Sequence, residues 1–239
     1  MGIRKFRGLD LMLSTVSSTI GLDQDLEKVF GDRKTKILSI AYYLLSNPEA
    51  AMYRFSPWAR IRFHPHREDI SSPRSSELFG SITEDTIQQF LQLRVQRSLD
   101  TSGWMAIDKV EKSFNNLKDR LSLRRTRCSS NDNFSGKVFI QFVALMLISH
   151  IRKIMSEKEL YKTFSYRQAI DEVDVIEYFE YRNRVGHWGE ITEKQGGILQ
   201  AFNVKLPMEA WPKSIQKMLS TEKKKAKKEQ QHTDKTAKT

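Results

Sequence analysis

The feature that most constrains this chain is an almost uninterrupted apolar run, VFIQFVALMLISHI, from Val138 to Ile151. The run is too short to span a bilayer and contains Gln141 and His150, so we expect a buried helix and no membrane partner. A helix from Val138 to about Met155 would be apolar on most faces, so other elements must surround it. The run therefore predicts a folded protein whose C-terminal half is centred on this helix.

Helical periodicity also occurs before this run. Apolar residues from Lys34 to Ser46 recur at the spacing of one helix face, and Asn47 with Pro48 ends that helix. Residues 56–76, SPWARIRFHPHREDISSPRSS, contain three of the chain's six prolines and show no sustained period. We expect a loop or linker there.

Three further segments have local signals. SELFGSITEDTIQQFLQLRVQRSL predicts two helices joined at Gly80 and Ser81, with Ser81 and Glu84 at capping-box spacing. This pair resembles a DNA-reading helix-turn-helix, although any helical hairpin has the same pattern. SYRQAIDEV predicts a short helix capped by Ser165, and VIEYFEY predicts a strand or a continued helix. His187 is expected in a loop.

The charge of the chain favours a polyanionic partner. Lysine and arginine number 40 against 29 aspartate and glutamate residues, which gives a formal charge of +11. Nucleic acid is the expected partner, and a solvated basic surface is the alternative. Two clusters of arginines are expected to neutralise DNA phosphates without reading sequence. Their members are Arg60, Arg62 and Arg67 in the first cluster, and Arg120, Arg124, Arg125 and Arg127 in the second.

Metal and redox chemistry have little support in the sequence. The single cysteine, Cys128, cannot form an internal disulfide, which fits a reducing bacterial cytoplasm. His64 and His66 alternate along the expected loop but lack a third metal ligand. The acidic residues of DEVD, ending at Asp174, are expected to be solvated, because no catalytic partner accompanies them. Asp10 interrupts the apolar N-terminal segment, so a signal peptide is not expected.

Several segments resemble bacterial insertion-sequence transposases of the DDE class. In VEKSFNNLKDRLSLRRTRCSSNDNFSGKVFIQFVALMLISHIRKIM, six residues separate Glu111 from Lys118, which is the family's spacing of glutamate and lysine. The stretches ELYKTFSYRQAIDEVDVIEYFE and GLDQDLEKVFGDRKTKILSIAYYLLSNP are also similar to the family. The likeness spans about Gly21 to Val204. It implies a mainly α-helical chain, with a helical N-terminal region and the helical C-terminal part of a ribonuclease-H-like catalytic domain.

The resemblance also implies roles for two residues. Glu111 corresponds to the third carboxylate of the catalytic triad, and Lys118 to the residue that contacts DNA near the cleavage site. Cleavage in the family uses two divalent metals, Mg²⁺ or Mn²⁺, which need carboxylates from separate elements. The family's two aspartates lie on strands well upstream, but here only 13 residues separate Arg97 from Glu111. Trp104 and Ile107 stand where the family tends to have a tyrosine and a basic residue.

These departures predict an internally deleted transposase whose central sheet is largely missing. We expect an N-terminal, DNA-binding region (1–97), a joint (98–109), a C-terminal remnant (110–219) and a disordered lysine-rich tail (220–239). Such a chain would bind DNA by similarity to the family, hold no metal and lack cleavage activity. DNA, further copies of the chain and a full-length transposase are the expected partners.

Two other functions are compatible with the same residues. One is a hydrolase or nuclease that uses Glu111 with Asp100 or Asp108, which requires the joint to fold back and supply metal ligands. The other is a regulator or assembly module that binds transposon ends or sequesters a full-length transposase.

Overall fold

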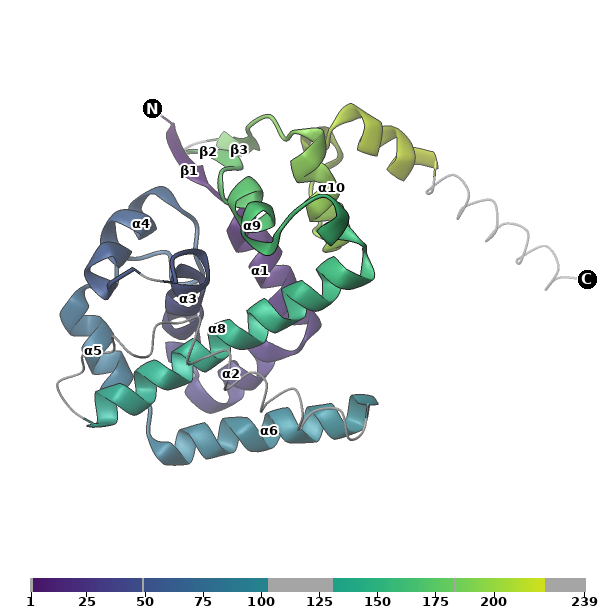
Figure 1. Ribbon diagram of the computed structural model, residues 1–239. Coiled ribbons are helices and arrows are strands. Elements are labelled where there is room, and N and C mark those ends of the chain that lie inside the picture. Colours follow the sequence, from purple (N-terminus) through teal and green to yellow (C-terminus); the bar gives the residue numbers. More distant parts are fainter. Residues whose placement is uncertain (1, 49, 103–130, 183, 222–239) are drawn as a thin grey trace, which may run out of the picture.

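The chain is mainly helical and has one small antiparallel sheet (Figure 1). The computed structural model describes residues 2–48, 50–102, 131–182 and 184–221. The N-terminal part contains β1 (Ile3–Phe6), α1 (Gly8–Thr19), α2 (Leu22–Phe30), α3 (Arg33–Ser46), α4 (Phe55–Ile61), α5 (Ser72–Gly80) and α6 (Glu84–Ser102). The C-terminal part contains α8 (Asn131–Glu157), α9 (Tyr166–Asp174), β2 (Glu177–Tyr181), β3 (Arg184–Trp188) and α10 (Glu193–Ala201). Short 3-10 turns lie at Met52–Arg54, Leu160–Lys162 and Met208–Ala210, and a last helix covers 213–221. The expectation of a mainly α-helical protein is confirmed.

Helix α8 crosses the middle of the molecule (Figure 1). Helices α3, α5 and α1 pack against it, and Val143, Ala144, Leu147 and Ile151 are fully buried. The helix continues well beyond its apolar run, so its length and composition would also allow it to cross a membrane. Helices of the same chain instead bury just over half of its apolar window.

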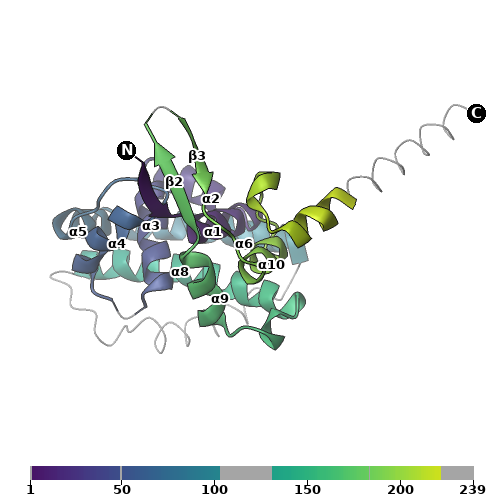
Figure 2. The same ribbon diagram turned by 90° about the horizontal axis from the view of Figure 1, so that it is seen from above.

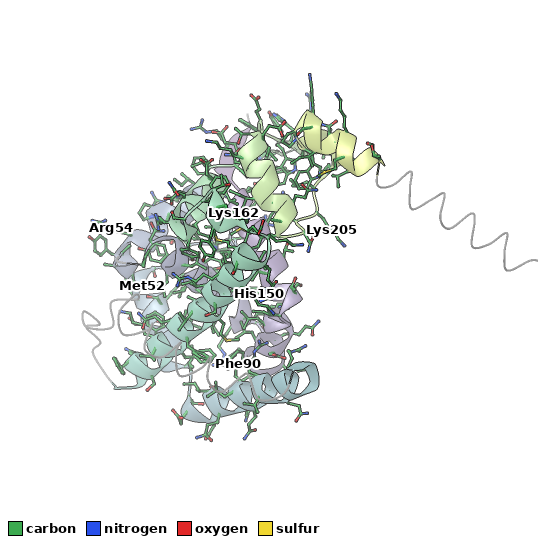
Figure 3. The ribbon with its side chains drawn as sticks, turned by 45° about the vertical axis from the view of Figure 1, so that its right-hand side comes forward. Met52, Arg54, Phe90, His150, Lys162 and Lys205 are labelled. Atoms are coloured by element: carbon green, nitrogen blue, oxygen red, sulfur yellow. The ribbon has the colours of Figure 1, made fainter. Side chains whose placement is uncertain are left out.

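One hydrophobic core joins the N-terminal and C-terminal parts. It extends from Leu9 on α1 to Ile215 in the last helix. Near one end of α8, the Phe139 ring lies 5.1 Å from the Phe30 ring of α2 and 5.2 Å from the Phe90 ring of α6, measured between centroids. Figure 3 shows Phe90 between α6 and α8. Aromatic contacts of this kind stabilise beyond the area that they bury, so α2, α6 and α8 are held at one point.

The sheet also joins the two parts of the chain. The strand order is β1-β2-β3, and both pairings are antiparallel (Figure 2). Lys5 of β1 lies opposite Tyr178 of β2, which lies opposite Trp188 of β3. The strand alternative for VIEYFEY is therefore confirmed. His187 lies in β3 and not in a loop, because it pairs with Phe179 across the hairpin.

The expectation of a loop over residues 56–76 is wrong. Helix α4 occupies its beginning and α5 its end, with 62–71 between them. Pro57 and Pro73 do not prevent this, because both lie in the first turn of a helix, where the missing N–H would have no intrahelical partner. Trp58 and Ala59 are buried, so one side of α4 packs against the rest of the fold.

Two caps were expected, and one of them is correct. Ser165 caps α9 in a complete capping box with Gln168. Helix α6 is capped by Thr83 and not by Ser81, since the Thr86 N–H donates to the Thr83 hydroxyl at 3.4 Å. The Ser81 hydroxyl donates instead to the Leu78 carbonyl.

The two helices of the suspected helix-turn-helix have different packing partners. Helix α5 packs mainly on α8, whereas α6 packs mainly on α2. Arg94 and Arg97 anchor α6 through the buried carboxylate of Asp25 on α2, at 2.9 and 2.7 Å. Burial alone would raise the pKa of Asp25, but hydrogen bonds from Arg97 and Arg94 hold it below its ordinary value. The face of α6 that contacts α2 therefore stabilises the fold.

Glycine at position 136 permits the close approach of α5 and α8. A Cβ there would lie 2.0 Å from the backbone oxygen of Phe79, which cannot move as a side-chain tip could. We expect Gly136→Ala to lower the free energy of unfolding by about 1–3 kcal/mol, because α5 must shift away from the core. Gly197→Ala is the matched control in another helix, since nothing lies within 4 Å of its Cβ.

Urea unfolding of both variants measures the difference. Gly197→Ala should raise stability by about 0.5–1 kcal/mol, the ordinary preference of a helix for alanine. A Gly136→Ala variant that gained as much would show that α5 does not contact α8 as described.

Candidate nucleic-acid interface

Most of the residues expected to contact DNA or metal lie outside the described part of the chain. These are Glu111, Lys118, Arg120, Arg124, Arg125 and Arg127. The structure places the other three, Arg60, Arg62 and Arg67, around α4 and the segment that follows it.

Arg62 is engaged within the fold. Its Nε lies 2.9 and 3.1 Å from the two carboxylate oxygens of Asp174, and its Nη2 lies 2.6 Å from one of them. The guanidinium also lies over the rings of Phe6 and Trp58. Such a forked pair is strong and directional, so Arg62 joins the end of α4 to α9. Asp174, expected to be solvated, is half-buried in this pair.

Arg60 and Arg67 are exposed. Arg67 has a φ of 63°, a left-handed conformation that costs free energy in a residue other than glycine. Its guanidinium carbon lies 4.9 Å from the centroid of the Phe63 ring. Arg67 therefore combines a strained backbone with a side chain that lies over the Phe63 ring.

Two more cations lie over the same ring. The Nζ of Lys5 is 5.6 Å and the guanidinium carbon of Arg7 is 4.8 Å from the Phe63 centroid. Phe63 is only 5% exposed, yet it lies outside the main cluster of the hydrophobic core. Cationic side chains are therefore among the groups that shield the Phe63 ring from solvent. Cation–π attraction compensates only part of the repulsion between three positive charges held so close together.

Two aromatic residues of the sheet complete this surface. The Tyr178 ring lies 5.6 Å from Phe63 and 5.0 Å from Trp188, and both contacts are edge-on. Arg7 lies over both of these rings as well, at 4.5 and 5.4 Å. Tyr178 and Trp188 remain half-buried. We call the set formed by Lys5, Arg7, Phe63, Arg67, Tyr178 and Trp188 the cationic sheet face.

The cationic sheet face keeps a net positive charge. Within the described ranges, Lys5, Arg7 and Arg67 form no ion pair with a carboxylate. Asp10 is the nearby acid. Burial raises its pKa above the ordinary value, while Arg67 and Arg7 oppose this shift. Because burial disfavours the charged form of Asp10, this carboxyl neutralises Arg7 and Arg67 only in part, and the surface is suited to bind an anion.

The two histidines of the expected loop act in the fold. His64 is buried against Phe55 and Trp58, and its Nδ1 lies 3.1 Å from the hydroxyl oxygen of Ser39. That hydroxyl donates to the Thr35 carbonyl at 2.7 Å, so it accepts a hydrogen bond from Nδ1 and His64 is the Nδ1–H tautomer. His66 contacts the Thr35 hydroxyl. Neither ring is arranged as a metal ligand.

No enclosed small-molecule or metal site is visible among the described residues. A pit lined by Asp10, Tyr42, Trp58 and Asp174 has no room for a water molecule. No group of three histidine, cysteine, aspartate or glutamate residues is placed to hold a metal in that part of the chain. The candidate site in this part of the chain is therefore an open surface and not an enclosed pocket.

Lys5 and Arg7 are not among the residues that the sequence predicted to contact DNA. Both lie in GIRKFRG, just before the N-terminal segment that Asp10 interrupts. Ile3–Phe6 reads IRKF, with two adjacent charges between two apolar residues, so no alternation of charged and apolar residues indicated a strand there. The approach of Lys5 and Arg7 to Phe63 depends on contacts between distant segments.

Acid should destabilise the fold through His64. Burial lowers the pKa of His64 to about 4, and nearby His66, Lys5 and Arg67 act in the same direction. The unfolded chain binds the proton near pH 6.5, so stability is complete above that pH and falls as the pH drops toward 4. We expect a loss of up to about 1.4 kcal/mol per pH unit in this window.

Urea unfolding between pH 7.5 and 4.5 tests this expectation. His64→Asn keeps a donor near the position of Nδ1 but cannot be protonated, so its stability should vary less with pH. Equal pH dependence in both proteins would assign the effect to other groups.

Comparison of the chain with known protein families, with curated proteins and with solved structures finds no match.

Proposed function

We propose that this protein binds DNA through the cationic sheet face and does not cleave it. The observation that carries the proposal is the convergence of Lys5, Arg7 and Arg67 on one aromatic ring, with no ion pair to a carboxylate among the residues that the structure describes. An anion that enters between these cations relieves their mutual repulsion, and a phosphate offers several oxygens to them at once. The chain's formal charge of +11 adds a general attraction to polyanions.

The face is better suited to a polymer than to a small metabolite. It is open, and it combines the flat half-buried rings of Tyr178 and Trp188 with cations from two distant segments. Phosphate contacts position a nucleic acid, and aromatic rings next to them accept sugars and bases. Nucleic acid supplies both kinds of group along one chain.

We further propose that the chain derives from a DDE-class transposase. Support comes from the spacing of Glu111 and Lys118 and from the similar segments on either side. The helical C-terminal part would then be the remnant of a ribonuclease-H-like domain, with the strands that carry two catalytic aspartates missing. One triad carboxylate cannot hold two metal ions, so DNA binding would remain without strand cleavage.

The binding proposal is tested by removing charge from the face. In the double variant Lys5→Gln, Arg67→Gly, we expect weaker duplex binding and a salt dependence lower by up to about two units. Glycine suits the positive φ at position 67, so this change should not lower thermal stability. Fluorescence anisotropy at several salt concentrations gives affinity and slope together.

A matched control removes the same charge elsewhere. Lys158 and Lys213 are exposed, and neither forms an ion pair within the described segments. Lys158→Gln, Lys213→Gln should bind DNA nearly as the unchanged chain does. If both double variants lost affinity equally, net charge and not this face would explain the binding. Arg124→Ala, Arg125→Ala tests the second arginine cluster in the same assay.

The proposed loss of cleavage is tested with supercoiled plasmid and transposon-end DNA. We expect neither nicking nor joining in Mg²⁺ or Mn²⁺, and no effect of Glu111→Ala on product formation. The same variant should bind DNA as well as the unchanged chain or slightly better, because a negative charge is removed. Lys118→Ala should weaken binding modestly. Metal-dependent nicking by the unchanged chain alone would mean that other carboxylates complete the site.

A further inference from the structure

The β2–β3 hairpin carries three stacked rings on the side opposite the cationic sheet face. His187 lies 4.8 Å from Phe179 with an interplanar angle of 14°, and 5.6 Å from Tyr181 with an angle of 21°. By contrast, the pairs that Phe139 and Tyr43 form in the core are tilted or edge-on. We call Phe179, Tyr181 and His187 the stacked column.

The stacked column is not part of the hydrophobic core. Phe179 and Tyr181 are half-buried and His187 is exposed, and none of the three belongs to the core cluster. Trp188, on the opposite side of the hairpin, does pack against that core. Figure 2 shows the hairpin projecting from the helices. Packing of the fold therefore does not account for three flat rings on this side.

The end of the column is held by the N-terminal segment. A Cβ at Gly2 would lie 2.6 Å from Cε1 of the Tyr181 ring, so the ring lies directly against this glycine. Arg4, which pairs with Phe179 on the same side, forms an ion pair with Glu177 at 3.2 Å. The contact with Gly2 restricts the Tyr181 ring before any ligand arrives.

Two arginines lie at the end of the hairpin that carries the stacked column. Arg182 and Arg184 are exposed at the end of the hairpin, and Arg184 lies opposite Tyr181 in the register of the strands. In the described part of the chain, neither arginine forms an ion pair. Flat rings flanked by unpaired guanidinium groups match a ligand that alternates flat bases with phosphates.

We propose that the stacked column binds unpaired bases of a single-stranded nucleic acid, with Arg182 and Arg184 on the neighbouring phosphates. His187 is stacked on both Phe179 and Tyr181, so an outer ring, already parallel to its neighbour, can extend the stack by one base without rearrangement. A duplex cannot use the column in this way, because its bases are stacked on one another. This inference rests on the proposed nucleic-acid binding but uses the other side of the sheet.

Two column variants and one matched control test the inference. Tyr181→Thr and His187→Thr remove rings while keeping a residue that favours strands, and Val185→Thr changes a side chain that is 93% exposed outside the column. We expect each column variant to bind a single-stranded oligonucleotide about tenfold more weakly. Duplex affinity should not change, and Val185→Thr should leave both affinities as they are.

Proton NMR of the unchanged chain gives a readout that needs no variant. Stacked bases should move the ring protons of Phe179 or Tyr181, the outer rings of the column, upfield when the single strand is added. Inorganic phosphate and duplex of the same sequence should produce no comparable shift. A similar shift with phosphate alone would assign the site to free anions and overturn the base-stacking role.

The outcomes separate this inference from the proposed function. If the column variants bind single strands as well as the unchanged chain, the inference fails while duplex binding through Lys5 and Arg67 stands. Equal loss of single-strand and duplex affinity would also overturn it, because the column would then act without regard to base pairing. If the unchanged chain binds neither nucleic acid, both proposals fail.

Discussion

The rest of the structure depends on keeping helix α8 out of water. Leaving its apolar residues exposed would cost more free energy than a domain of this size can spare, so other elements must cover them. Helices α1, α3 and α5 do so, and all three come from the N-terminal part of the chain. Gly136 shows how close this contact is, since no side chain fits between α8 and the backbone of α5. The core is therefore shared, and neither part of the chain buries its apolar surface alone.

This shared core also determines where the candidate interface lies. Once α1 is packed beside α9, the preceding strand β1 is placed to pair with β2, and Lys5 comes opposite Tyr178. The segment after α4 is brought to the same place by the ion pair of Arg62 with Asp174. The cationic sheet face is thus assembled from three segments that are distant in sequence. Each supplies one or two side chains, and only tertiary packing brings their charges together.

Local patterns in the sequence identified elements well and contacts poorly. The helix from Lys34 to Ser46 and the Ser165 cap depend on residues three or four positions apart, and both expectations are correct within one residue. The prolines of 56–76 indicate a loop only when their position is ignored, because two of them lie in the first turn of a helix, where proline is tolerated. The arginines there looked alike in sequence, yet Arg62 is bound to a carboxylate 112 positions away and Arg67 is not. No local signal distinguishes them, because the difference depends on which distant acid the fold brings near.

The same distinction separates two populations of cations in this basic protein. Arg62, Arg94 and Arg97 are bound to Asp174 or Asp25, where removing one partner would leave a charge in a partly dry environment. These arginines stabilise the fold and have little freedom to bind a ligand. Cations over aromatic rings keep their charge available, because a ring attracts a cation without neutralising it.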